Sequence, residues 1–268
     1  MRPQGNKERS HHPLGVDGAR MIGTPSDSCS TGALAKINRQ FYEPLWARSR
    51  LASPERFNTW PLVRSLLATS PSRLEVAPGL NPRLPIDGTR FLDTSEAAVA
   101  KLVAGGANAT VGLVGHLPYA DAAFDLIGAF DILEHVDDDA EALSELSRVA
   151  APAATLLLSV PLHPSRWTRF DELVGHGRRY RPDEVLARLA QARWSLERSG
   201  VYGMQPRSTL LSNFAVWSFE HRRRRAIWWY SRAILPLGTF FQGKLELCPG
   251  MIDAQDVDEV LLVCRRLG

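Results

Sequence analysis

Two acidic side chains lie at the ends of short apolar runs that have the character of strands. Glu75 lies in the run Leu74-Glu75-Val76, which leads into the turn Ala77-Pro78-Gly79, and Asp93 follows Phe91-Leu92. A carboxylate at a strand end can accept hydrogen bonds from both hydroxyls of a nucleoside ribose. The spacing therefore predicts a ligand-binding turn after the first strand and a nucleoside contact at Asp93. Asp93 could also cap the helix expected from Ser95, and the two roles are compatible.

Three histidines follow later apolar runs and suit proton transfer near neutral pH. His135 follows the fourth predicted strand, His163 directly follows Leu-Leu-Leu-Ser-Val-Pro-Leu, and His176 lies within Gly-His-Gly-Arg-Arg-Tyr. We expect His163 and His176 to be the candidate catalytic bases, and His135 to be structural. No metal site is expected, because the neighbouring acidic run Asp137-Asp138-Asp139 suits the N-terminus of the next helix.

The segment around His176 has two interpretations. In the first, the segment is an acceptor site in which Arg178 binds an acidic group and His176 or Tyr180 polarises the substrate hydroxyl. In the second, the segment is a loop that ion pairs from its arginines anchor to Asp171 or Glu172.

These residues need a scaffold, and the chain supplies alternating strand and helix patterns, which imply a parallel sheet with helices on both faces. The first helices are expected between residues 32 and 68, one of them starting at Ser53 and Pro54. We predict the later strands at 73–77, 90–93, 110–113, 124–129, 154–160, 195–203 and 257–265, and helices at 95–104, 138–150 and 182–193. The expected fold is α/β, doubly wound and Rossmann-like, with a seven-stranded mixed sheet.

The ends of the chain differ from this core. Residues 1–32 are rich in Gly, Ser, Pro and charge without periodicity, and we expect a disordered tail. One domain is expected over 33–268, with an N-terminal helical cap at 33–70 and a helical insertion at 207–250.

Composition narrows the class of protein. The 268 residues carry a net charge of only +3, which gives no reason to expect nucleic-acid binding. Three cysteines without a CxxC spacing favour a reducing, cytoplasmic location over a disulfide framework or structural zinc. Apolar stretches are too short for a membrane-spanning helix of roughly 20 residues.

The order of these pieces from Leu74 to Leu189 resembles class I S-adenosylmethionine-dependent methyltransferases. The resemblance is most specific in LPYADAAFDLIGAFDILEHVDD, LLLSVPLH and GHGRRY. It implies S-adenosylmethionine as cofactor and an antiparallel pairing of the last two strands.

The resemblance also implies a set of cofactor contacts. The first loop, with Glu75, Ala77 and Gly79, would approach the methionine part, and Asp93 would hold the ribose. The segment before Leu117-Pro118 would face the adenine, through Gly115, His116 and Leu117. Phe130, with Ala129 and Asp131, would close the pocket below the sulfonium.

Two departures from the family pattern matter. Of the three glycines expected in the first loop, only Gly79 remains, with Ala77 and Asn81 at the other positions. Pro82, Pro85 and Gly88 also exclude the usual helix before the second strand. S-adenosylmethionine carries no phosphate, so a helix N-terminus is dispensable here and a prolyl loop can offer the same backbone groups. The second departure is Leu113, where many members place an aspartate near the adenine.

The expected reaction is methyl transfer to a small-molecule acceptor, with oxygen favoured. One alternative is a binding protein that kept the fold and lost catalysis. A second is a methyltransferase acting at a membrane surface on a lipid or glycan, because HRRRRAIWWYSRAILPLGTFF has the composition of an interfacial helix. Otherwise these aromatics would pack on the domain. We expect the insertion to form a lid over the acceptor, with Phe214 and Trp217 in contact with it.

Overall fold

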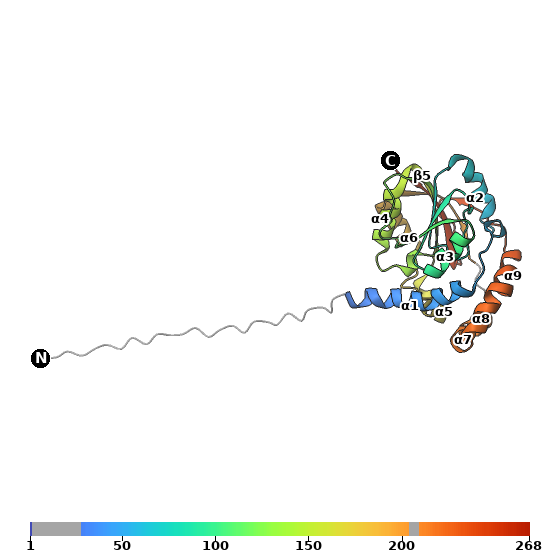
Figure 1. Ribbon diagram of the computed structural model, residues 1–268. Helices are drawn as coiled ribbons and strands as arrows, with labels where there is room; N and C mark the ends of the chain where they lie inside the picture. The colour runs from blue at the N-terminus through green and yellow to red at the C-terminus, as the bar shows by residue number, and fades with distance from the viewer. Residues whose placement is uncertain (2–27, 204–208) are drawn as a thin grey trace.

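An eight-stranded sheet lies at the centre of the computed structural model, which describes Met1 and residues 28–203 and 209–268 (Figure 1). Its strand order is β3-β2-β1-β4-β5-β8-β6-β7. The strands span Arg73–Val76 (β1), Thr89–Asp93 (β2), Asn108–Val111 (β3), Phe124–Phe130 (β4), Ala150–Pro161 (β5), Trp194–Val201 (β6), Cys248–Pro249 (β7) and Glu259–Arg266 (β8).

Strands β1 to β5 are mutually parallel, and β8 enters antiparallel between β5 and β6. The mixed, doubly wound sheet and the antiparallel pairing of its last two long strands are therefore confirmed. The predicted count of seven is one too low, because the two-residue β7 pairs with Arg198 and Ser199 of β6. Two residues are too few to give a periodic signal in the sequence.

Helices cover both faces of the sheet. They span Ser28–Arg48 (α1), Trp60–Leu66 (α2), Glu96–Ala104 (α3), Asp139–Val149 (α4), Arg169–Val174 (α5), Pro182–Gln191 (α6), Thr209–His221 (α7), Arg223–Trp229 (α8) and Leu235–Phe240 (α9). Apolar side chains of α4 and α6 pack with Leu74, Val76 and Ile127 on one face. Those of α3 and α2 pack on the other face, against Phe91 and Leu126 respectively, and Figure 1 shows the two layers.

The chain between β1 and β2 forms no helix, as its prolines predict. The helix expected from Ser53 is wrong in its extent, because only a single 3-10 turn forms at Pro54–Arg56 and α2 starts at Trp60. The Ser53 hydroxyl donates to the Glu55 carboxylate and so caps no backbone N–H. Most of the expected tail at 1–32 lies outside the described residues, but its last five residues belong to α1.

Helix α1 lies at the carboxyl edge of the parallel strands, where a doubly wound sheet binds its ligands. It contacts α3, α5, α8 and the 3-10 helix η3 (Leu133–His135). Its Glu43 carboxylate accepts hydrogen bonds from the Ser95 hydroxyl and the Ala97 backbone N–H, just after β2. No helix in the described part of the chain is both long and apolar enough to cross a membrane.

Candidate functional site

The first candidate contact is the junction of β1 and β2. Asp93 is buried, and its Oδ2 accepts a hydrogen bond of 2.8 Å from the backbone N–H of Gly79. Its Oδ1 accepts one of 2.8 Å from Ser95, whose hydroxyl caps α3 through the N–H of Ala98. Burial raises the pKa of Asp93 to about 6. Asp93 thus anchors both the first loop and α3, and each carboxylate oxygen retains a second lone pair for another donor.

Glu75 holds the far end of the same loop. Its carboxylate accepts backbone hydrogen bonds from Arg83 at 2.9 and 3.0 Å and from Leu84 at 2.8 Å. Burial raises its pKa to about 7, against the lowering effect of these N–H groups. Glu75 therefore fixes the return of the prolyl loop, and this geometry makes it a positioning residue.

The turn between these two anchors needs left-handed backbone. Ala77 has φ of 51° and Gly79 has φ of 55°. A Cβ on Gly79 would lie 2.2 Å from Cζ2 of the Trp46 indole, which α1 places over the loop. A glycine is therefore needed at position 79 for two reasons: the positive φ of its backbone and the close approach of Trp46 on α1.

The loop expected to face the adenine lies beside β2. The N–H of Gly112 donates to the backbone oxygen of Asp93, and the N–H of Leu117 donates to Glu145 of α4 at 2.8 Å. Leu117 is buried, whereas His116 is exposed. A Cβ on Gly115 would lie 3.1 Å from the Glu141 carboxylate. The segment is thus placed next to the ribose candidate Asp93, and its role toward adenine stays a prediction.

Three acidic side chains gather after β4 and at the start of β8. Asp131 has φ of 51°, and its Oδ1 accepts a hydrogen bond of 2.5 Å from the Ser159 hydroxyl. Glu134 Oε2 and Glu259 Oε1 are buried without a hydrogen-bond partner among the described residues. Burial, and after it the charge of Asp131, raises the pKa of both glutamates well above the usual range. We call Asp131, Glu134 and Glu259 the acidic cluster.

Aromatic hydroxyls and one guanidinium surround the acidic cluster. Burial raises the pKa of Tyr42 and Tyr230, and the charge of Asp131 raises it further. The hydroxyl of Tyr202 accepts a hydrogen bond of 2.9 Å from Nε of Arg83, whose guanidinium stacks 3.7 Å over the ring of Phe57. The buried Phe130 ring lies against Tyr202, with centroids 6.1 Å apart.

Two histidines lie beside Glu134. His176 donates from Nδ1 to Asp171 Oδ1 at 2.8 Å, which leaves its Nε2 facing Glu134 Oε1 at 4.0 Å. His135 donates from Nδ1 to Gly175 O at 3.1 Å, so its Nε2 can accept the Tyr42 hydroxyl at 3.3 Å. Burial, followed by the effect of His176, lowers the pKa of His135 to about 3. His176 is therefore the better placed of the two for proton transfer.

The same groups are the candidate for a metal ion. One ligand atom each of Glu134, His135 and His176 lies within 4.8 Å of the others. That spacing is wider than the ligand separation of roughly 3.3 Å that zinc–nitrogen bonds of about 2.0 Å require in a tetrahedral site. The cluster would have to contract to hold zinc.

The other predicted acceptor residues lie elsewhere. His163 has φ of 60°, and its Nε2 donates a hydrogen bond of 2.7 Å to the backbone oxygen of Ala254. This hydrogen bond involves no residue of the acidic cluster. Tyr180 is fully buried and donates to Asp139 at 2.7 Å, and Arg178 pairs with the same carboxylate at 2.8 Å. The prediction that Arg178 and Tyr180 bind an acceptor has no support in this geometry.

The anchoring interpretation of that segment is confirmed. The Arg179 guanidinium pairs with Asp171 at 2.9 Å, and both side chains are buried. Burial alone would raise the pKa of the Asp171 carboxyl, but the hydrogen bonds from His176 and Arg179 lower it. The buried Asp139 carboxylate also pairs with Arg188 at 2.6 Å. This role was not predicted from the sequence, because the Asp137-Asp138-Asp139 run indicated only a helix start. Asp138 does cap α4, through the N–H of Glu141.

Phe214 and Trp217 lie on the outer side of α7. They are 65% and 42% exposed and stack on each other with centroids 6.1 Å apart. The inner side of α7 carries Phe219, which packs on Phe41 of α1. The described structure therefore does not bring Phe214 and Trp217 to the acidic cluster, and a lid contact would need a movement of α7.

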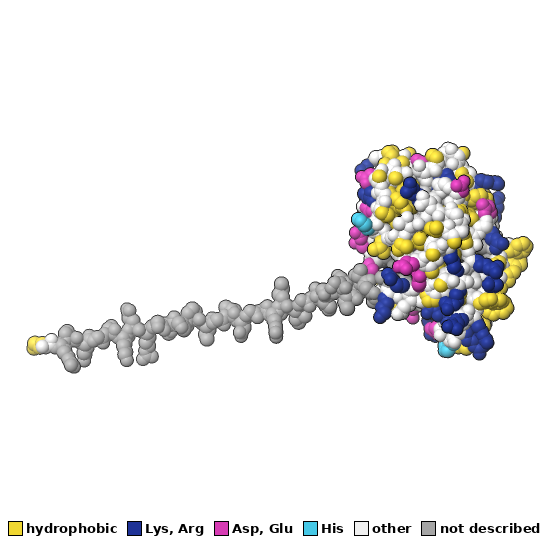
Figure 2. Space-filling view, viewed as in Figure 1, with side chains coloured by type: hydrophobic (Ala, Val, Ile, Leu, Met, Phe, Trp, Pro, Cys, Tyr) yellow, Lys and Arg dark blue, Asp and Glu magenta, His cyan; other side chains and the backbone are white. Residues whose placement is uncertain are grey.

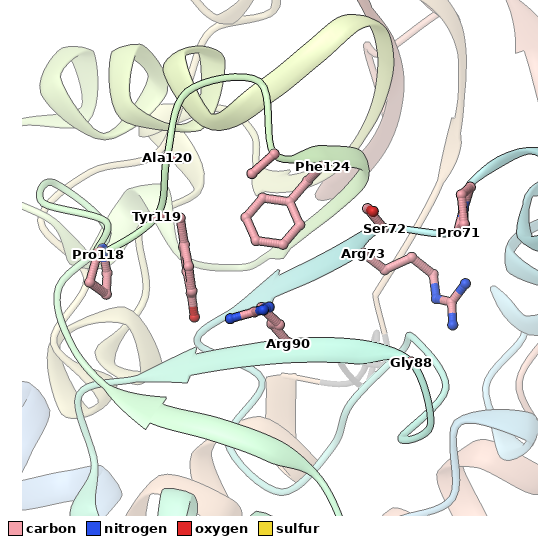
Figure 3. Close-up of a pocket in the computed structure, with 10 residues that line it drawn as sticks. Pro71, Ser72, Arg73, Gly88, Arg90, Pro118, Tyr119, Ala120 and Phe124 are labelled. Atoms are coloured by element: carbon pink, nitrogen blue, oxygen red, sulfur yellow. The ribbon is translucent and has the colours of Figure 1, made fainter.

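A cavity of about 400 Å³ lies at the opposite edge of the sheet (Figure 3). Its lining includes residues at the starts of three strands. They are Ser72 and Arg73 at β1, Gly88 at β2, and Tyr119 and Phe124 at β4. These are the amino ends of the strands, whereas ligands of doubly wound sheets bind at the carboxyl ends. We therefore assign the site to the carboxyl edge.

Comparison with known proteins agrees with this assignment. Residues 89–158, from β2 into β5, match the family described as "Methyltransferase domain". An S-adenosylmethionine-dependent methyltransferase from Thermotoga maritima, described as a possible histamine N-methyltransferase, superposes with a TM-score of 0.53 at 13% identity, covering 90% of this chain and 96% of that one. The [4+2]-cyclase SpnF superposes with a TM-score of 0.53 at 16% identity, covering 88% of this chain and 95% of the cyclase.

Because these identities are low, the superpositions show only the fold. The cyclase is described by a reaction other than methyl transfer, so the fold alone does not establish the reaction. The matched segment contains Asp93, Leu117 and the β4 end, where the candidate site lies. Together, the matched segment and the topology assign this chain the class I S-adenosylmethionine-dependent methyltransferase fold and S-adenosylmethionine as its cofactor.

Proposed function

We propose that this chain transfers the methyl group of S-adenosylmethionine to a small-molecule acceptor, with a hydroxyl oxygen favoured. The observation that carries the proposal is the acidic cluster at the carboxyl edge. Glu134 and Glu259 each bury a carboxylate oxygen without a partner among the described residues, which is costly unless a cation or donor completes the site. A sulfonium and an ammonium, both present in S-adenosylmethionine, would satisfy that need.

The surrounding residues fit the rest of the cofactor. Asp93 has free lone pairs for ribose hydroxyls, and Ala77 and Gly79 supply a turn with left-handed backbone beside it. Glu75 holds this loop from behind. S-adenosylmethionine, when bound, supplies an activated methyl group, so the chain has to align the acceptor and exclude water.

A hydroxyl acceptor needs a base, and His176 has the orientation for it. Asp171 holds its Nδ1–H at 2.8 Å, which fixes the tautomer with Nε2 as acceptor. That nitrogen faces Glu134, so a hydroxyl between them could pass its proton to His176. His135 is a poor base at neutral pH because burial lowers its pKa to about 3.

The free cysteine side chains of Cys248 and Cys264 agree with a reducing compartment, and we place the protein in the cytoplasm on that ground.

The second candidate function is a binding protein without catalysis, which the depleted glycine loop favours. It would bind cofactor and leave it unchanged.

A screen with methyl-labelled S-adenosylmethionine tests the proposal. Phenols, alcohols, carboxylic acids and amines are offered separately, and label transfer and S-adenosylhomocysteine are both measured. We expect transfer to at least one hydroxyl compound by the wild type and none above background by Glu134→Gln. Transfer only to amines would refute the preference for oxygen. Cofactor binding without any transfer across the screen would favour the binding protein.

A further inference from the structure

The chain exposes large apolar side chains on the outer side of α7, α8 and α9 and of the residues that join and follow them. Phe240 and Phe241 are 80% and 76% exposed, and the further members are Phe214, Trp217, Trp228, Trp229, Ile234 and Leu237. We call this set the aromatic face. Figure 2 shows yellow side chains protruding beside dark blue ones at the part of the molecule where Figure 1 places α8 and α9.

The aromatic face is not the packing side of these helices. Val216 of α7, Ala226 and Ile227 of α8, and Leu235 of α9 are buried and point inward. The inner side attaches the segment to the domain, whereas the ring contacts of the outer aromatics are with other residues of the same segment. Soluble monomeric proteins rarely expose this many large apolar side chains on neighbouring helices unless the surface binds a partner. The prediction that these aromatics pack on the domain is wrong for Trp228, Trp229, Phe240 and Phe241.

Charge on the part of this segment that follows α7 has one sign. Between His221 and Leu245 the sequence holds five arginines and one lysine, and no aspartate or glutamate. Arg224, Arg225 and Arg232 are exposed, and none of them forms an ion pair with a described residue. Arg223 differs, because it donates to the backbone oxygens of Gln40 and Phe41 on α1.

Arginines and indoles lie together on this face. The Arg232 guanidinium lies 5.6 Å from the Trp228 ring centroid, and that of Arg222 lies 5.7 Å from that of Trp217. Tryptophan and arginine side by side on one surface suit the headgroup level of a bilayer, where the ring enters the boundary and the guanidinium meets phosphate.

We propose that the aromatic face, with Arg224, Arg225 and Arg232, attaches the protein to the surface of an anionic lipid membrane. The helices would lie in the plane of the interface, since none in the described chain can span it. The excess of basic charge between His221 and Leu245 selects a negatively charged bilayer over a neutral one.

This attachment would place the candidate site close to the lipid. The same helical segment turns Tyr230 inward, where burial raises the pKa of its hydroxyl and the charge of Arg83 opposes that rise. α8 also contacts α1, which covers the carboxyl edge of the sheet. An acceptor that resides in the membrane could therefore reach the site from the surface. The inference does not depend on methyl transfer, because membrane binding is measured without any acceptor or cofactor.

Vesicle co-sedimentation tests the proposal. The full chain is mixed with vesicles of phosphatidylcholine alone, or with phosphatidylglycerol added at about one third, at low and high salt. We expect binding to the anionic vesicles, weakening as salt rises, and at least about tenfold weaker binding to the neutral ones. Tryptophan emission should shift to shorter wavelength as Trp228 and Trp229 leave water.

Two variants separate the apolar and charged contributions. Trp228→Ser with Trp229→Ser should reduce partitioning by about tenfold or more, and so should Arg224→Gln with Arg225→Gln and Arg232→Gln. Val103→Ser, an exposed apolar position on α3, and Arg56→Gln with Arg64→Gln are matched controls that should bind as the wild type. Circular dichroism melting checks that every variant is folded.

Three outcomes would overturn the proposal. The first is no binding of the folded wild type to anionic vesicles at low salt. The second is equal loss in the variants and their controls. The third is a concentration-dependent dimer, or a complex with RNA, that the aromatic variants abolish while vesicle binding is absent.

Discussion

The carboxylate of Asp93 accepts a hydrogen bond of 2.8 Å from the backbone N–H of Gly79, and this contact joins the ends of β1 and β2. A helix after β1 is therefore not needed to fix the first loop. The contact also places the ribose candidate directly beside the turn that would hold the methionine part of the cofactor.

Asp93→Ala should weaken cofactor binding by about 1–3 kcal/mol and also lower stability, because the N–H groups of Gly79 and Ser95 lose their acceptor. Asp93→Asn keeps one acceptor oxygen and should lose less stability. Calorimetry and thermal melting measure the two effects. If stability falls and affinity holds, Asp93 is only a helix and loop anchor.

Glu75 and Asp93 should each contribute more folding stability to the cofactor-free protein at low pH than at neutral pH. The folded pKa of Glu75 is raised to about 7 from 4.5, so the folded state binds the proton more tightly. This contribution is complete below pH 4.5 and is lost as pH rises through 7, by up to about 3 kcal/mol. Asp93, raised to about 6, acts in the same direction.

Urea unfolding of wild type and Glu75→Gln at several pH values between about 4.5 and 7.5 measures this effect. The stability advantage of the wild type should shrink steadily as pH rises, since the amide introduced by Glu75→Gln does not titrate. Parallel pH profiles for the two proteins would show that Glu75 does not carry the raised pKa.

Gly79 and Trp46 should be coupled. Gly79→Ala places a methyl group against the indole and strains a backbone angle of 55°, which should cost about 1–3 kcal/mol of folding stability. Trp46→Ala removes the obstruction but not the strain, so the double variant should lose less than the sum of the two. Additive losses would mean that α1 does not press on this loop.

Much of the fold follows from local sequence patterns. The Leu74-Glu75-Val76 and Phe91-Leu92-Asp93 runs predicted strands, and the amphipathic spacing of 138–150 predicted α4. Boundaries moved by a few residues, as at β3, where Asn108–Val111 replaces 110–113. Local patterns could not show that α1 would cover the carboxyl edge, because that depends on contacts such as Trp46 with Gly79.

The acidic cluster shows the same limit. Asp131 and Glu134 were visible after the fourth predicted strand, but Glu259 lies far along the chain, at the start of the last strand. Only the antiparallel insertion of β8 beside β5 brings it to the same edge. An acidic residue directly before an apolar strand, as in Glu259-Val-Leu-Leu-Val, was the available signal.

His176 and His163 should differ in their effects on turnover. His176→Asn can still donate to Asp171 but lacks the nitrogen that faces Glu134, so kcat on a hydroxyl acceptor should fall by roughly 100-fold or more with KM little changed. His163→Asn removes a hydrogen bond to Ala254 and should affect stability more than kcat. Full turnover in His176→Asn would remove it as the base.

Calorimetric titration of the wild type with S-adenosylmethionine and with its neutral thioether product S-adenosylhomocysteine tests the cofactor site most directly. We expect one saturable site for both, with a thermal stabilisation of about 2.7 kcal/mol at about 100 times the dissociation constant. S-adenosylmethionine should gain affinity over the product as pH rises, because Glu134 and Glu259 ionise and attract the sulfonium. No binding of either compound to the folded protein at millimolar concentration would contradict the account.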